Sequence, residues 1–190
     1  MEMDRMKIDI IGVAETRWPD NGEFWSGDYK VIHTGTIEGR PGVGGVAIVM
    51  NKEAGKKVKG YLQCDGRIIL VKLNTKPKDT IVIQVYMPTT NERDEEVEKV
   101  YDMLIELIEG IKGDENVIIM GDWNATVGEG REGMIVGPFG LGKRNERGDR
   151  LVVPAIVVEG AKSRGEEEGG RREAFAPPSV ARVRMTRTLQ

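Results

Sequence analysis

Short runs of apolar residues, bounded by turn residues, recur through the first three quarters of this sequence. The runs cover residues 7–14, 43–50, 67–73, 80–87 and 116–122 and are rich in β-branched side chains. Each is apolar at consecutive positions rather than at alternate ones, so both faces of the strand that it predicts must be covered. The pattern is typical of an α/β fold whose sheets are buried on both sides.

The connections between the later runs indicate how their strands pair. The third and fourth runs are separated by Lys76-Pro77-Lys78-Asp79, a turn that predicts an antiparallel hairpin. Residues 92–112 have apolar side chains at intervals of three and four, which predicts a long helix with one apolar face. Thr89 with Glu92, or Asn91, supplies its start signal, and Gly113 marks its end. The helix therefore suits a crossover between the fourth and fifth strands.

The remainder of the chain differs in composition. From residue 153 to residue 190, glycine, acidic and arginine-rich stretches replace the apolar runs. Such composition predicts a disordered tail, because it supplies too little apolar surface to form a core. We therefore expect one domain over residues 1–152 and a divergent, disordered tail over residues 153–190.

Charge and cysteine content limit the compartment and the partners. The net charge is −3, so no overall basic field attracts nucleic acid, and binding would need a local patch or a metal ion. Cys64 is the only cysteine, which favours a reducing compartment. The N-terminal residues lack the apolar core of a signal peptide, and no run is long enough to span a bilayer. We expect an intracellular protein, cytoplasmic or nuclear and not secreted, whose sequon Asn124-Ala125-Thr126 is not glycosylated.

Polar residues follow several of the predicted strands. They are Glu15, Tyr86, Asp122 and Asn124, and side-by-side strands would bring them to one rim of a sheet. Carboxylates at such a rim suit a hard cation such as Mg²⁺, which can activate water and offset phosphoryl charge. Each residue alone also has an ordinary structural interpretation: a solvent-exposed acid, a packed tyrosine, or a turn or helix cap. His33, the only histidine, has no ligand-type partner nearby in sequence, which favours a structural role.

Taken together, six motifs resemble the endonuclease/exonuclease/phosphatase superfamily. In order and spacing they are most similar to the endonuclease domains of non-LTR retrotransposons and to the related craniofacial development protein 2-like sequences. The resemblance covers residue 7 to about residue 151. It implies a four-layer α/β sandwich, present here in part, with its second half incomplete. The motifs are IDIIGVAETRW, GVGGVAIVM, RIILVKL, IVIQVYMPT, VIIMGDWNATVG and FGLGKRNERGDRL.

The resemblance implies a role for each polar residue at the rim. Glu15 corresponds to a glutamate that holds Mg²⁺ or Mn²⁺ against the scissile phosphate. Tyr86 is similar to a tyrosine that approaches the phosphate. Asp122 resembles an aspartate that orients or deprotonates the attacking water, and Asn124 an amide that holds the phosphate and the aspartate. These roles agree with the chemistry of the residues, one metal-binding carboxylate, one base and neutral donors.

Further residues are candidates for contacts with DNA. Arg17 and Trp18 follow the metal-binding glutamate and are expected to line the nucleic-acid side. Lys143, Arg144 and Asn145 are expected either to contact backbone phosphates or to be solvated loop residues.

The sequence also departs from the family pattern. The family begins with a strand that carries a metal-binding asparagine and ends with an aspartate-histidine pair, and neither is present here. We therefore expect a metal-dependent phosphodiester hydrolase of the DNA-endonuclease type, weak or inactive in this truncated chain. Two alternatives stay open, a remnant that binds nucleic acid or a partner without catalysis, and a phosphatase that acts on lipids or nucleotides.

Overall fold

The computed structural model describes residues 2–131, 136–151 and 184–185. Its strands form two sheets. The four-stranded sheet has the order β1-β4-β3-β2, and the five-stranded sheet has the order β5-β6-β7-β8-β9. The strands are β1 (Ile10–Ala14), β2 (Gly22–Ser26), β3 (Tyr29–His33), β4 (Val46–Asn51), β5 (Val58–Cys64), β6 (Ile68–Leu73), β7 (Thr80–Tyr86), β8 (Asn116–Asp122) and β9 (Arg184–Met185). The labelled helices are α1 (Glu2–Met6), α2 (Lys52–Gly55) and α3 (Asp94–Glu109), and residues 146–151 are also helical.

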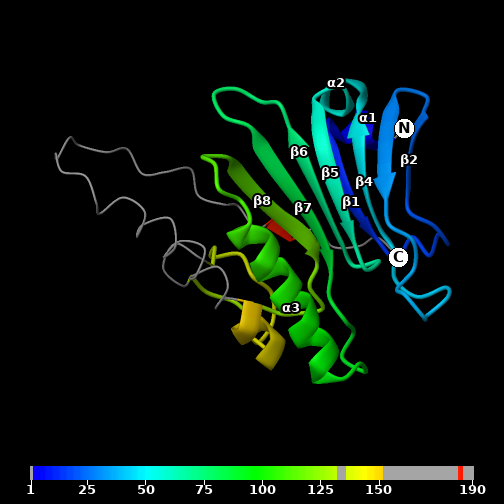
Figure 1. The fold of residues 1–190 in the computed structure, drawn as a ribbon. Helices are drawn as coiled ribbons and strands as arrows, with labels where there is room; N and C mark the ends of the chain where they lie inside the picture. The colour runs from blue at the N-terminus through cyan, green and yellow to red at the C-terminus, as the bar shows by residue number, and fades with distance from the viewer. Residues whose placement is uncertain (1, 132–135, 152–183, 186–190) are drawn as a thin grey trace.

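The predicted connections are present. β6 and β7 pair as an antiparallel hairpin, and β7 and β8 pair in parallel across the crossover helix α3. In Figure 1 the two sheets lie against each other, and α3 lies on the face of the five-stranded sheet that points away from the four-stranded sheet. These layers correspond to part of the expected α/β sandwich. The predicted boundary at residue 152 and the predicted tail lie outside the described residues, apart from β9.

The bounds of the long helix differ from the prediction. α3 begins at Asp94 rather than Glu92 and ends at Glu109 rather than Lys112. Its N-cap residue is Arg93, which makes no side-chain cap bond, so the expected start signal is wrong. The carboxylate of Glu92 is instead bound to two arginines. Gly110, not Gly113, is the C-cap residue.

Two apolar cores explain why the strands are apolar at consecutive positions. One core lies between the sheets, where Ile32 and Ile48 pack against Val71 and Val82. The other lies between the five-stranded sheet and α3, where Ile81 and Ile83 pack against Val100 and Leu104. Successive residues of β7 thus enter opposite cores, as strand alternation requires.

Four of the described strands were not predicted from the sequence: β2, β3 and β5, and β9, whose residues lie in the predicted tail. Most residues of β2 are exposed. β5 has no fully buried residue, and its pairing with β6 is irregular between Val58 and Gly60. Their formation depends on pairing with the strongly apolar strands beside them rather than on their own composition.

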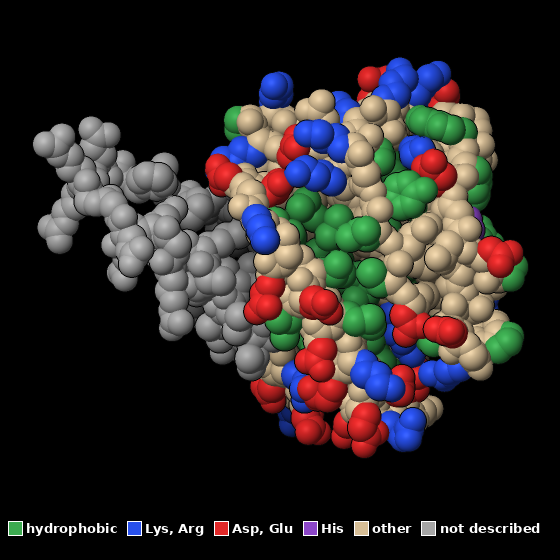
Figure 2. Space-filling model, in the orientation of Figure 1, with side chains coloured by type: hydrophobic (Ala, Val, Ile, Leu, Met, Phe, Trp, Pro, Cys, Tyr) green, Lys and Arg blue, Asp and Glu red, His purple; other side chains and the backbone are tan. Residues whose placement is uncertain are grey.

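The surface beside α3 combines apolar and charged regions. Figure 2 shows hydrophobic side chains in the middle of the visible face and acidic and basic side chains below them, over the first turns of α3. No helix among residues 2–131, 136–151 and 184–185 is long and apolar enough to cross a membrane.

Candidate active site

The ends of three strands meet at one rim, because of how the strands are paired. Tyr86 and Asp122 are the last residues of the parallel strands β7 and β8 and are partners in register. Glu15 follows the last residue of β1 in the other sheet. The Tyr86 hydroxyl donates a hydrogen bond of 2.8 Å to Glu15 Oε1, across the space between the sheets. The predicted metal-binding glutamate and phosphate-facing tyrosine are therefore in contact.

The carboxylate of Glu15 has a second partner. Arg17 Nη2 donates to Glu15 Oε2 at 2.6 Å, so each carboxylate oxygen accepts one hydrogen bond. The bond from Arg17, followed by the bond from Tyr86, lowers the pKa of Glu15 below its ordinary value. The carboxylate is thus held ionised, as a ligand for a divalent cation must be.

The backbone around Glu15 has an unusual conformation. Glu15 and Arg17 both have positive φ angles, 57° and 55°. The N–H groups of Thr16 and Arg17 donate to the carbonyls of Gly45 and Gly44, each at 3.0 Å. Non-glycine residues in this conformation cost free energy, and they cluster at functional sites where surrounding structure holds them. The glycine-rich motif before β4 therefore shapes the segment that presents Glu15.

Tyr86 is held in place by its burial between the two sheets. Its side chain is 4% exposed and belongs to the core between the sheets. Burial, followed by the hydrogen bond to Glu15, raises the pKa of Tyr86 above its ordinary value. The phenol is therefore a neutral donor, the form needed to hydrogen-bond an anionic oxygen.

Strand alternation explains why an acid and an amide stand one residue apart after β8. Trp123 is 5% exposed and its side chain packs in the core beneath α3. Asp122 and Asn124 flank this buried tryptophan, and Asp122 Oδ1 accepts a 3.1 Å bond from the Asn124 N–H. The Asn124 side chain donates to the carbonyl of Met87 at 2.8 Å, and its φ is 45°. Asp122 and Asn124 are thus locked to each other and to the end of β7.

The predicted DNA-facing residues have different environments. Arg17 is bound to Glu15, whereas Trp18 forms an exposed aromatic cluster with Phe24 and His33. The centroids of the Trp18 and His33 rings are 4.5 Å apart, so the only histidine in the sequence is in an aromatic contact.

Asn145 is exposed, but its side chain is occupied in holding the loop after β8. Its Oδ1 accepts hydrogen bonds from the N–H groups of Thr126 and Gly148, at 3.0 Å and 2.8 Å. Arg144 Nε donates to the carbonyl of Val127 at 2.8 Å in the same loop. Lys143 is exposed.

The donor set fits a divalent cation only in part. Within the described residues there is no group of three histidine, cysteine, aspartate or glutamate side chains able to hold a metal ion. Glu15 is a half-exposed hard-oxygen ligand, and Mg²⁺ is often bound by one or two carboxylates, with waters and substrate phosphates completing its shell. A cation held by Glu15 would fit this kind of site, in which waters and substrate phosphates supply the other ligands.

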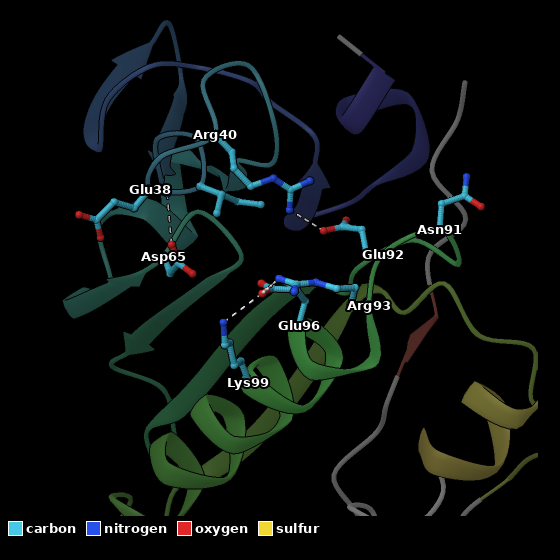
Figure 3. A pocket seen from close by; sticks show the side chains of 9 residues that line it. Glu38, Arg40, Asp65, Asn91, Glu92, Arg93, Glu96 and Lys99 are labelled. Carbon is cyan, nitrogen blue, oxygen red and sulfur yellow. Dashed lines mark hydrogen bonds and ion pairs between the residues drawn. The ribbon is translucent and has the colours of Figure 1, made fainter.

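Sequence reasoning missed a chain of charged residues next to the site. Arg67 is buried, and its Nη2 donates to Glu92 Oε2 at 2.9 Å. Arg40 donates to the same oxygen at 2.6 Å. Figure 3 shows the Arg40 and Glu92 side chains pointing toward each other in a pocket beside α3. Arg67 directly precedes a strand, where an arginine ordinarily faces solvent, so no local signal in the sequence indicated its burial.

Comparison with known proteins identifies the family of this chain. The profile of the Endonuclease/Exonuclease/phosphatase family matches residues 2–151. The chain belongs to this family. Relatives within the Endonuclease/Exonuclease/phosphatase family include craniofacial development protein 2 of Bos taurus and of Tragulus javanicus, each 38% identical over 151 residues and 80% of this chain. The chain spans 25% and 26% of the lengths of these two relatives.

Solved structures confirm the Endonuclease/Exonuclease/phosphatase fold. The endonuclease domain of TRAS1, a telomere-specific non-LTR retrotransposon, aligns with a TM-score of 0.50 at 17% identity, over 83% of this chain and 61% of the domain. The AP endonuclease LMAP of Leishmania major aligns with a TM-score of 0.53 at 12% identity, over 80% of this chain and 57% of that enzyme. At these identities the likeness shows a shared fold.

Proposed function

We propose that this chain carries part of the catalytic centre of a divalent-metal-dependent phosphodiester hydrolase that acts on DNA. The observation that carries the proposal is the 2.8 Å hydrogen bond from Tyr86 to Glu15, formed beside the Asp122–Asn124 pair. The carboxylate of Glu15, the neutral hydroxyl of Tyr86 and the Asp122–Asn124 pair thus lie at the ends of β1, β7 and β8. This set suits attack of water on a phosphodiester.

The residues have distinct roles in the proposed reaction. Glu15 holds Mg²⁺ or Mn²⁺, which when bound offsets the negative charge of the phosphate. Asp122 accepts a proton from the attacking water. Asn124 is a neutral donor for the oxygens on which charge develops in the transition state. Tyr86 donates its single O–H to Glu15 and holds that carboxylate in place. Members of the family generally use divalent metal ions, which supports this assignment.

Several observations favour DNA as the substrate. TRAS1 and LMAP, which share the fold, are both named as endonucleases. Trp18 and Phe24 present exposed aromatic surface, and such rings can stack on bases. Arg17 places a cation beside Glu15. DNA as a substrate, together with the free thiol of Cys64, favours a nuclear or cytoplasmic site of action.

A non-catalytic remnant that binds nucleic acid is the second candidate. Arg17 is already ion-paired with Glu15, and the described residues hold no three-ligand cluster for a metal ion. We therefore expect this chain alone to cleave DNA weakly or not at all.

Nicking of supercoiled plasmid in Mg²⁺, in Mn²⁺ and in EDTA tests the proposal. Any cleavage by the purified chain is expected to be metal-dependent and to fall roughly 100-fold or more in Asp122→Asn, which keeps the shape but removes the base. Asp102→Asn is the matched control, because Asp102 is exposed on α3 away from the rim. Equal loss in both variants would contradict the assigned role of Asp122.

DNA binding separates the two candidates when no cleavage is observed. Metal-independent binding without nicking supports the remnant. Failure to bind DNA under any metal condition would rule out both candidates for this chain.

A further inference from the structure

Beneath the rim, Arg67 contacts Tyr86 in three ways. The Arg67 carbonyl accepts a 2.9 Å bond from the Tyr86 N–H, and Arg67 Nη1 donates to the Tyr86 carbonyl at 3.3 Å. The guanidinium carbon lies 5.4 Å from the centroid of the Tyr86 ring. One side chain thus contacts both the backbone and the ring of the residue whose hydroxyl meets Glu15.

Arg67 is itself held in place by Glu92. The Arg67 side chain is 2% exposed, and a permanently charged group at that depth needs a counterion. Glu92 supplies it from the loop before α3. Arg40 binds the same carboxylate oxygen, as the dashed line in Figure 3 marks. Burial opposes ionisation of Glu92, but the bond from Arg40 and the charge of Arg67 outweigh it and lower the pKa of this carboxyl.

The contacts form one continuous path. It runs from Arg40 through Glu92 and Arg67 to Tyr86, and from Tyr86 to Glu15. The first two residues lie at the mouth of the pocket beside α3, and the last lies at the rim between the sheets. Arg67 is the member that joins the two regions.

We propose that Arg67 is a positioning residue of the candidate site, which holds the Tyr86 hydroxyl against Glu15. The expected consequence is a carboxylate that is well placed to bind a metal ion, and this part rests on the proposed function. The geometric part, that Arg67 acts through Tyr86, can be tested without metal and without activity. Arg67 touches neither substrate nor metal in this arrangement, since Tyr86 lies between it and Glu15.

Four variants test the role of Arg67. Arg67→Met removes the cation and keeps a long side chain, and Glu92 still has Arg40 as its partner, so no unpaired buried charge remains. Arg67→Lys keeps the charge but loses the planar fork that reaches both Glu92 and Tyr86. Arg40→Met is the matched control, because Arg40 binds the same carboxylate without contacting Tyr86 and is 42% exposed. Tyr86→Phe removes only the hydroxyl.

The metal-free readout is the nuclear Overhauser effect between the Tyr86 ring and the Glu15 side chain in the purified chain. We expect it to be lost in Arg67→Met, weakened in Arg67→Lys and kept in Arg40→Met. Retention in a folded Arg67→Met would overturn the proposal. If Arg67→Met does not fold, Arg67→Lys decides, and an unchanged signal there would also overturn it.

Mn²⁺ affinity, measured by electron paramagnetic resonance, tests the consequence for the site. We expect Arg67→Met to weaken Mn²⁺ binding about tenfold, as loss of a hydrogen bond that orients a metal ligand does. In the Tyr86→Phe background Arg67→Met should weaken binding no further, because both changes break the same link. Additive losses would overturn the proposal. Absence of Mn²⁺ binding to the unaltered chain would instead reject the proposed metal site and leave the positioning role to the metal-free readout.

Discussion

The Tyr86 hydroxyl donates to Glu15 Oε1 at 2.8 Å and so joins the last residue of β7 in one sheet to the residue that follows β1 in the other. Tyr86 is in the core between the sheets, whereas Glu15 is half-exposed at the rim. The bond is thus the point at which the packing of the two sheets sets the position of a candidate metal ligand.

This bond predicts a pH-dependent contribution to stability. The pKa of Glu15 is lowered, first by Arg17 and then by Tyr86, so the contribution is present above the ordinary value of 4.5 and is lost as the pH falls through the lower folded-state pKa. We expect Tyr86→Phe to be less stable than the parent at pH 7, and the difference to shrink below about pH 4.5. Urea unfolding at several pH values measures it. Tyr61→Phe, which changes a partly buried tyrosine of β5, is the control, and an equal pH dependence for both variants would contradict the prediction.

Gly45 is expected to be indispensable to the segment that carries Glu15. Its φ is +86°, and a Cβ atom there would lie 2.4 Å from Thr16 Oγ1 and 3.0 Å from Arg17 N. Gly39 also has a positive φ, +72°, but a Cβ there would meet nothing within 4 Å. Gly39→Ala should therefore cost only the left-handed backbone term, about 1 kcal/mol, and Gly45→Ala about 2–3 kcal/mol more because of the clash. Urea midpoints of the two variants provide the comparison, and equal losses would show that the close approach does not matter.

The sequence predicted those parts of the fold that depend on local patterns. The consecutive apolar runs, the Lys76–Asp79 turn and the periodicity of α3 indicated the hairpin and the crossover, since each signal is contained in one segment. The weakly apolar strands β2 and β5 escaped prediction, because neighbouring strands stabilise them.

The strand ends indicated which polar residues could meet at one rim, whereas their individual roles came from the family resemblance. Glu15 and Tyr86 are 71 residues apart, and nothing local indicates that they touch. Arg67 and Glu92 were missed for the same reason: their burial and pairing come from tertiary packing. The functional roles assigned to all the site residues stay predictions: Glu15, Arg17, Trp18, Tyr86, Asp122, Asn124 and Asn145.

Trp123 is expected to anchor the Asp122–Asn124 pair. It is 5% exposed in the core under α3, so Trp123→Ala should cost about 3–5 kcal/mol, as large core truncations do. Trp25 is 47% exposed on β2, and Trp25→Ala should cost well under half as much. Thermal or urea unfolding compares the two. Hydrogen exchange at the Asn124 amide should also accelerate only in Trp123→Ala, and unchanged protection there would show that the pair is held without the tryptophan.

Asn145 directly precedes residues 146–151, which are helical. Substitutions at Asn145 can therefore test whether its side chain stabilises the structure or binds DNA. Its Oδ1 accepts from the Gly148 N–H, the bond that a helix N-cap makes, and from Thr126 in the loop after Asn124. We expect Asn145→Ala to cost about 1–2 kcal/mol and Asn145→Asp to be nearly neutral, because aspartate keeps the acceptor oxygen. Lys143→Ala should leave stability unchanged. If Lys143 contacts a phosphate, its removal should lower the salt dependence of DNA binding by about one unit of slope. A stable Asn145→Ala that loses DNA affinity would show that Asn145 acts on the nucleic acid rather than on the loop.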